Sequence, residues 1–310
     1  VRRVQKELLD DGLHLASQNP VVRPGEPCTV RQTAGTVALD GERELAFEAG
    51  DRVTVRPLDP CGDCPACRAG HSHVCMNLKF IGIDSPGAMQ GLWTVPAHTL
   101  HRLPPNLDFR HAALIEPVSV ACHDVRLGEV RAGEFAVVLG GGPIGVLIGL
   151  VARAEGARVL VSELNPYRVE LAHGLGLDAV NPRELDLVQL VNERTGGAGA
   201  DVVFEVSGSA AGAELMTKLP RVRGRMVMVA IHGQPQPVDL FRFFWRELRL
   251  VGARVYEPRD FERAIELAAS GALPLDRLIT KEVGLDGLGG AFREMESGGE
   301  VMKILVRCSE

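Results

Sequence analysis

From Glu134 onward, the chain alternates short apolar runs with longer stretches that have the periodicity of amphipathic helices. Phe135–Leu139 is apolar throughout and predicts a buried strand, and Pro143–Ala154 predicts the helix after it. Arg158–Val161 predicts the next strand, and Asn165 with Pro166 supplies the N-cap and first position of another helix. This alternation is typical of a parallel sheet with helical crossovers.

Four further apolar runs extend the pattern, and helical stretches separate most of them. Together with the two strands above they give six strands joined by crossovers, which make a complete doubly wound parallel sheet of the Rossmann type. The predicted fold class of this part is therefore α/β. The further strands are expected at Ala179–Val180, Val202–Val206, Arg225–Ile231 and Leu248–Val255.

The segment before this sheet has a different character. Residues 1–107 are rich in proline and glycine and contain short valine-rich runs, which predicts an irregular β domain. A helical pattern begins at Asp108, a candidate N-cap, and Pro117 is expected to bend that helix part-way.

The segment after the sheet predicts two helices and a strand, at Arg259–Ser270, Leu285–Glu296 and Met302–Val306. Because the sheet is already complete, we expect this tail to pack on the first domain. The sequence therefore predicts a first domain of residues 1–122 and 258–310 and a Rossmann domain of residues 123–257.

Composition narrows the possible functions. The chain has 310 residues, enough for about two domains, with an ordinary apolar fraction of 45%. The net charge is −6 and no basic block occurs, so a nucleic-acid partner is disfavoured. Val1–Gly12 lacks the apolar core of a signal peptide, and the longest apolar stretch, Pro143–Ala152, is too short for a bilayer. We therefore expect a cytoplasmic protein without a membrane partner.

A glycine-rich loop directly follows the strand Phe135–Leu139. In the pattern G-x-G-x-x-G, Gly140 allows the tight turn, Gly142 lets the backbone approach a pyrophosphate, and Gly145 lets the helix pack closely. The free N–H groups at the helix N-terminus suit phosphate. The pattern alone is also typical of an ordinary turn, but its place between strand and helix favours dinucleotide binding. The loop reads Gly140-Gly141-Gly142-Pro143-Ile144-Gly145.

Glu163 lies at the end of the next predicted strand, where a carboxylate accepts hydrogen bonds from ribose hydroxyls. Because a carboxylate repels a 2′-phosphate, Glu163 favours NAD over NADP. Arg168 lies close in sequence, where it can bind phosphate, pair with Glu163 or cover the adenine.

Four of the seven cysteines lie between Cys61 and Cys75. In a chain without an export signal, this spacing indicates a metal rather than disulfides. Four thiolates suit a tetrahedral zinc ion and leave no open position, so we predict a structural zinc. His71 and His73 are interpreted as surface residues because the cysteines complete the ligand set. The predicted ligands are Cys61, Cys64, Cys67 and Cys75.

With these motifs in place, the chain resembles the zinc-containing medium-chain dehydrogenases, most closely the sorbitol, threonine and butanediol dehydrogenases. The similarity extends over nearly the whole length from Thr33. It rests on Ala34-Gly35-Thr36-Val37, Gly50-Asp51-Arg52-Val53, the cysteine lobe, the segment Leu114–Ala121, the glycine loop, Glu163 with Arg168, Ser270-Gly271 and Lys303.

The resemblance implies a GroES-like catalytic domain beside the Rossmann domain, and oxidation of an alcohol with NAD. It also implies a catalytic zinc that lowers the pKa of the alcohol, and a role for Glu116 near that metal. Without this context Glu116 would be interpreted as a solvated acid. His123 is interpreted as a structural helix residue. His232 lies near the expected position of the nicotinamide, but a loop residue is its default interpretation.

Two motifs of the resembled family are missing. The family takes a zinc-binding cysteine from Gly-x-Cys-Gly-Ser/Thr-Asp and a histidine from Gly-His-Glu. Val30-Arg31-Gln32 stands where the latter is expected, and Cys28 is interpreted as an incidental or buried thiol. Either the catalytic zinc loop has been lost, or residues of the protein are missing from this sequence. We favour the second alternative because Glu116 is present.

The leading hypothesis is therefore an NAD-dependent, zinc-assisted oxidoreductase that interconverts a secondary alcohol and its ketone. The substrate is expected to be a polyol, sugar alcohol or similar small hydroxy compound. Two alternatives are a catalytically inactive NAD-binding protein with one structural zinc, and a zinc-independent reductase of the same fold. The resembled family also implies a homodimer or homotetramer.

Overall fold

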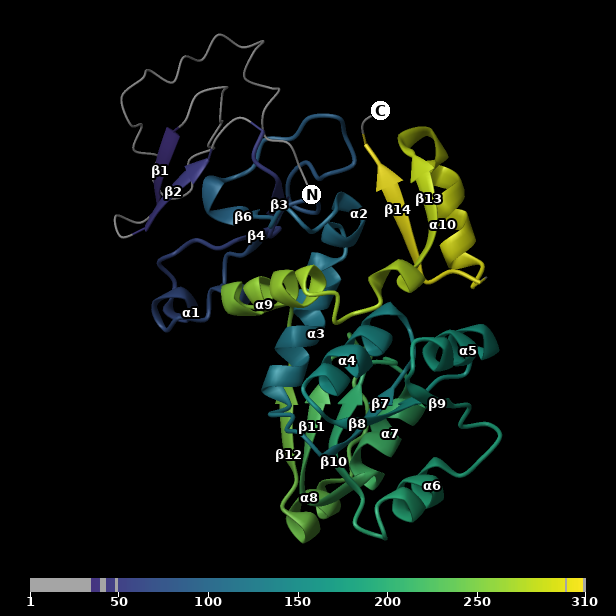
Figure 1. Ribbon diagram of the computed structural model, residues 1–310. Coiled ribbons are helices and arrows are strands. Elements are labelled where there is room, and N and C mark those ends of the chain that lie inside the picture. The colour runs from purple at the N-terminus through teal and green to yellow at the C-terminus, as the bar shows by residue number, and fades with distance from the viewer. Residues whose placement is uncertain (1–34, 40–42, 48–49, 299, 309–310) are drawn as a thin grey trace. The chain divides into compact units, whose positions relative to one another are not determined.

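The computed structural model describes residues 35–39, 43–47, 50–298 and 300–308 (Figure 1). Cys28 and Val30-Arg31-Gln32 lie outside these residues. The described chain forms two compact units, which we treat separately. The first contains the residues up to Ile115 together with Lys281–Ser297 and those from Ile304, and the second contains Glu116–Thr280 with the stretch ending at Lys303. The sequence-based division, with boundaries at 122/123 and 257/258, stays a proposal.

The second unit contains the predicted doubly wound sheet. Its six strands are all parallel, and their order is β12-β11-β10-β7-β8-β9. Of these six strands, β7 comes first in the sequence and lies in the middle of the sheet. The strands that follow it in sequence are added first on one side of β7 and then on the other, as in Rossmann domains. The strands are β7 (Phe135–Leu139), β8 (Arg158–Ser162), β9 (Asp178–Val180), β10 (Ala200–Glu205), β11 (Pro220–Met228) and β12 (Arg249–Gly252).

Helices cover both faces of this sheet (Figure 1). Successive residues of a strand point to opposite faces. Val137 belongs to the buried cluster that includes side chains of α6 and α7, whereas Val138 contacts the start of α4. All residues of β7 are buried, which explains its continuous apolar sequence. The helices are α4 (Pro143–Ala154), α5 (Pro166–Gly174), α6 (Leu187–Arg194), α7 (Ala210–Lys218) and α8 (Leu240–Arg246).

Strand β11 differs from its prediction at both ends. It begins at Pro220 rather than Arg225, because Pro220 pairs with Ala200 and the register is irregular between this pair and the pair Val202–Arg225. It ends at Met228, and Ile231 lies in the following loop with 97% of its surface exposed. Apolar character alone therefore placed the end of this strand too late.

The helical segment after Leu107 is divided in two, as α2 (Phe109–Ala112) and α3 (Ile115–Leu127). Asp108 is the N-cap of α2, as predicted, and accepts a hydrogen bond from the His111 N–H at 2.8 Å. The predicted bend at Pro117 is wrong, because the break precedes it. Pro117 lies in the first turn of α3, where a missing N–H leaves no intrahelical bond unmade.

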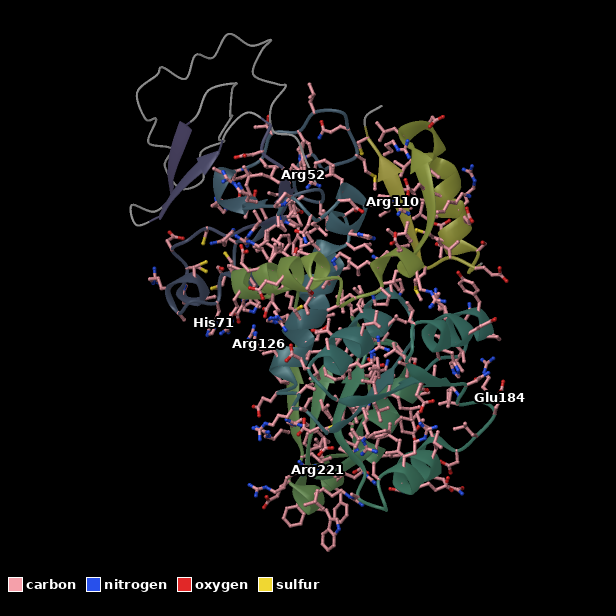
Figure 2. The ribbon with its side chains drawn as sticks, viewed as in Figure 1. Arg52, His71, Arg110, Arg126, Glu184 and Arg221 are labelled. Atoms are coloured by element: carbon pink, nitrogen blue, oxygen red, sulfur yellow. The ribbon has the colours of Figure 1, made fainter. Side chains whose placement is uncertain are left out.

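Helix α3 is joined to α9 (Pro258–Ala269) by a buried ion-pair network. Asp260 accepts two hydrogen bonds from Arg126 (labelled in Figure 2), at 2.7 and 2.8 Å, and lies 2.7 Å from Nδ1 of His123. Asp260 also accepts the Glu257 N–H at 2.9 Å and so caps α9. Burial raises the pKa of Asp260, but the bonds from Arg126 and His123 outweigh it and hold the pKa below its ordinary value. His123 is therefore a structural helix residue, as interpreted.

The first unit is built from short paired strands and has the irregular β character predicted for it. Within the described residues, no helix of the chain is both long and apolar enough to cross a bilayer. The strand pairs are β1 (Gly35–Leu39) with β2 (Arg43–Phe47), β3 (Val53–Val55) with β6 (Leu100–Arg102), β4 (Leu58–Asp59) with β5 (Lys79–Phe80), and β13 (Ile279–Gly284) with β14 (Lys303–Arg307). The described helices not yet named are, in this unit, α1 (Pro65–Arg68), α10 (Leu288–Glu296), η1 (Ser72–Val74), η2 (Ala97–Thr99) and η4 (Leu285–Gly287), and in the second unit η3 (Leu275–Leu278).

Candidate functional site

The glycine loop has the geometry that its sequence predicts. Gly140 has a φ of +107°, which side chains disfavour, and a Cβ there would lie 3.0 Å from the Ser207 nitrogen. A Cβ on Gly145 would lie 1.8 Å from the Gly140 carbonyl oxygen. Gly142 is the N-cap of α4, and a Cβ there would meet only the Arg168 guanidinium, at 3.8 Å. The loop therefore presents open backbone at the start of a helix, which fits a pyrophosphate.

The carboxylate of Glu163 is bound to this loop. It accepts hydrogen bonds from the N–H groups of Gly141, Leu164 and Asn165, at 2.7, 2.8 and 2.8 Å. A Cβ on Gly141 would lie 2.8 Å from that of Glu163. Sequence reasoning missed this contact, although the middle glycine of the run was a signal for it. Glu163 is only half-buried, so lone pairs of its oxygens remain for ribose hydroxyls.

Arg168, in the first turns of α5, lies beside the same loop. Its Nε is buried and has no hydrogen-bond partner among the described residues. An orphaned cationic donor beside Gly142 is suited to an anionic or aromatic group of a ligand. The loop, Glu163 and Arg168 therefore fit a dinucleotide, and their binding roles stay proposals.

A second polar cluster lies at the carboxyl ends of β10 and β11. Glu205 is fully buried, and Nε2 of His232 lies 3.0 Å from its Oε2. The Ser207 hydroxyl and N–H donate to its Oε1 at 2.5 and 3.0 Å. Sequence reasoning interpreted His232 as a loop residue and did not include Glu205, because the two come together only in the folded sheet.

The four cysteines of the lobe form one cluster. Their sulfur atoms all lie within 4.8 Å of one another, and Cys75 Sγ lies 3.8 Å from Cys64 Sγ and 3.5 Å from Cys61 Sγ. A tetrahedron with Zn–S bonds of about 2.3 Å has S···S edges of about 3.8 Å, whereas a disulfide needs about 2.0 Å. The cluster of Cys61, Cys64, Cys67 and Cys75 therefore fits zinc and not disulfides.

The charge requirement of the lobe also points to a cation. The N–H groups of Cys67 and Met76 lower the pKa of Cys64 to about 6. Burial, together with the thiols of Cys64 and Cys75, raises the pKa of Cys67 to about 12. Four thiolates this close therefore need a metal ion to be ionised together.

The two histidines of the lobe differ from each other. His71 is exposed, as interpreted (Figure 2). The interpretation of His73 as a surface residue is wrong, because this side chain is buried in η1. Its ring lies edge-on to that of His71 at 6.3 Å, and the metal-ligating cluster contains cysteines alone among the described residues. Four cysteines fill the ligand set, so His73 packs in the lobe instead.

Glu116, at the start of α3, lies in a third cluster, with Lys303 and Tyr256. Burial raises the pKa of Glu116, while the Lys303 charge and the Tyr256 hydroxyl oppose this shift. Burial likewise lowers the pKa of Lys303, and Glu116 opposes it. Glu116 is thus a half-buried carboxyl with a cationic neighbour rather than a fully solvated acid.

Comparison with known proteins adds to this geometry. A family model described as zinc-binding dehydrogenase matches residues 143–270, and one described as alcohol dehydrogenase GroES-like domain matches residues 13–105. A 2-dehydro-3-deoxy-L-galactonate 5-dehydrogenase of Pseudoalteromonas atlantica is 54% identical over 90% of this chain and 82% of its own length. A sorbitol dehydrogenase of Halalkalibacterium halodurans is 32% identical over 88% of this chain and 81% of its own length.

A solved structure has the same fold. It is a putative zinc-binding dehydrogenase of Sinorhizobium meliloti bound to NADP. Its TM-score is 0.79 at 32% sequence identity, over 92% of this chain and 85% of that one.

Proposed function

Because the chain belongs to the zinc-containing medium-chain dehydrogenase family, we propose that it oxidises the C5 hydroxyl of a 2-oxo-3-deoxy sugar acid with NAD. That the protein is a zinc-assisted dehydrogenase of a secondary alcohol follows from the family itself. The sugar-acid substrate is the more specific part of the proposal, and the relative with 54% identity supports it. The reaction would convert a secondary alcohol and NAD⁺ into a ketone, NADH and a proton.

The choice of NAD rests on Glu163. Its carboxylate is held by Gly141 and by the turn after β8, so it cannot readily turn away from a 2′-phosphate. Arg168 opposes this preference, because its free Nε is suited to phosphate. NAD, when bound, supplies the hydride acceptor. We expect the carboxylate to prevail because it lies at the end of β8 itself, beside the ribose position of this fold.

We propose that Cys61, Cys64, Cys67 and Cys75 hold a structural zinc and that Glu116 is the catalytic carboxyl. A second zinc would polarise the substrate hydroxyl, and its family ligands lie in motifs missing from this sequence. Glu116 is half-buried near the Lys303 charge, and this position would let it hold or release a proton. A second candidate function, an inactive NAD-binding protein, would apply if the protein lacks these motifs altogether.

We also propose a homodimer formed through α8 and β12. Leu240, Phe241, Phe244 and Trp245 form one exposed face of α8, and Trp245 is 70% exposed. The Phe241 and Trp245 rings stack at 5.9 Å. Strand β12 is at the edge of the described sheet and pairs only with β11 there. An apolar face beside an open strand edge is typical of an interface between two copies.

The cytoplasmic location stays a prediction.

The test is an assay of the purified protein with zinc and NAD, followed by NADH absorbance. We expect turnover of 2-dehydro-3-deoxy-L-galactonate to exceed that of sorbitol or L-threonine, and Glu116→Gln to lower turnover while NAD binding stays unchanged. Turnover of sorbitol alone would contradict the sugar-acid assignment. NAD binding without turnover of any of these alcohols would support the inactive alternative.

A further inference from the structure

The His232 imidazole has a fixed orientation. Its Nε2 lies 3.0 Å from the Glu205 carboxylate, and the remaining partners of that carboxylate are the donors of Ser207 and Gly208. Because the carboxylate accepts from each of them, we assign the hydrogen of the contact to Nε2. In neutral His232, Nδ1 is then a hydrogen-bond acceptor.

That acceptor is not satisfied within the chain. Nδ1 of His232 is shielded from solvent and has no hydrogen-bond partner among the residues that the structure describes. Buried polar atoms nearly always have a partner, so an orphaned one beside a binding site indicates that a ligand supplies the missing donor. The donor must be an N–H or O–H group.

The position of His232 identifies the part of the ligand concerned. A Cβ on Gly140 would lie 3.0 Å from the Ser207 nitrogen, and one on Gly208 would lie 3.5 Å from the Ile231 oxygen. The loops after β7, β10 and β11 therefore lie side by side at the carboxyl edge of the sheet. With the adenosine half directed to Glu163 after β8, the other half of a dinucleotide extends toward β10 and β11.

We propose that His232, oriented by Glu205, is a positioning residue that accepts a hydrogen bond from the carboxamide N–H₂ of the nicotinamide. This proposal rests on the dinucleotide part of the proposed function and is independent of the alcohol substrate. For the carboxamide to reach Nδ1 of His232, the loop after β11 must shift. Within the described chain, no backbone–backbone hydrogen bond outside helices and strands involves residues 231–238, so no main-chain bond of this kind opposes a shift of the loop.

The test compares three ligands by calorimetry, namely NAD, ADP-ribose and 3-acetylpyridine adenine dinucleotide. ADP-ribose has no nicotinamide, and the acetylpyridine analogue has a methyl ketone without N–H groups. His232→Phe should weaken NAD binding roughly threefold to tenfold, as for the loss of one hydrogen bond. The same variant should bind the other two ligands as the wild type does.

Two variants complete the design. His232→Asn retains an acceptor near the position of Nδ1, so it should recover most of the affinity for NAD. His173→Phe removes an imidazole whose Nε2 lies 2.7 Å from the Ala179 carbonyl oxygen, and should change no affinity. Wild-type NAD affinity in His232→Phe, or an equal loss for NAD and the analogue, would overturn the proposal. Failure of the wild type to bind NAD would instead overturn the proposed function.

Discussion

Alanine at Gly145 and alanine at Gly142 are expected to damage the protein in different ways. The Gly145→Ala methyl would lie 1.8 Å from the Gly140 carbonyl oxygen, so the loop and α4 must move apart by more than about 1 Å. Overpacking of this kind typically costs about 1–3 kcal/mol. For a unit of this size that lowers Tm by about 2–4 °C per kcal/mol.

The Gly142→Ala methyl meets only the Arg168 guanidinium, at 3.8 Å, and Gly142 has an ordinary φ of −66°. We expect the free energy of unfolding of the Gly142→Ala protein to differ from that of the wild type by less than about 1 kcal/mol. Its methyl would instead project where the pyrophosphate approaches. A loss of about 1–3 kcal/mol in binding corresponds to roughly 5-fold to 150-fold weaker NAD affinity.

The assay pairs thermal unfolding without ligand with calorimetric titration of NAD. Gly145→Ala should lower both Tm and affinity, whereas Gly142→Ala should lower affinity alone. A Gly145→Ala protein with wild-type Tm and NAD affinity would refute the packing reasoning. An equal loss of Tm in both variants would refute the assignment of Gly142 to the ligand.

Four further predictions address the other clusters. Cys64→Ser should lose one zinc per chain in elemental analysis and lower Tm, with NAD affinity unchanged; full zinc retention would contradict the ligand assignment. Glu163→Ala should narrow the gap between NAD and NADP affinity, measured by titration, and a wild-type preference for NADP would show that its role is misinterpreted. Asp260→Asn should cost about 2–4 kcal/mol at pH 7, because Arg126 would keep only the Glu257 carboxylate, at 3.1 Å, among the described residues. Because the pKa of Asp260 is lowered in the folded state, this stability is present above its unfolded pKa and lost as the pH falls, so urea titrations of variant and wild type should converge in acid. Trp245→Glu should yield monomers in light scattering, and an unchanged mass would exclude α8 from the interface.

Local signals predicted the Rossmann unit well. Strand β7 and helix α4 lie at their predicted bounds, because a buried strand followed by three glycines can be recognised from about a dozen residues of sequence. Asn165 and Asp108 cap their helices as expected, since capping involves only near neighbours. The cysteine cluster could also be predicted from the sequence, because its four cysteines lie close together in the chain.

Contacts between distant residues were not predictable in this way. His232 and Glu205 are 27 positions apart, and nothing near either residue indicates the other. Lys303 was noted only by resemblance, without its relation to Glu116. The error at Pro117 has a different cause, because proline is tolerated in a first turn and the prediction started the helix too early.

Asp260 has a consequence for the order of events during synthesis. It follows Arg126 by 134 positions, yet it holds α3 and also begins α9. At about 5–20 residues per second, α3 leaves the ribosome roughly 7–27 seconds before this carboxylate is made. During that interval His123 and Arg126 lack the Asp260 carboxylate, so the contact between α3 and α9 cannot form. A nascent chain stalled before Asp260 should therefore remain sensitive to protease around α3, and protection should arise only once α9 has emerged.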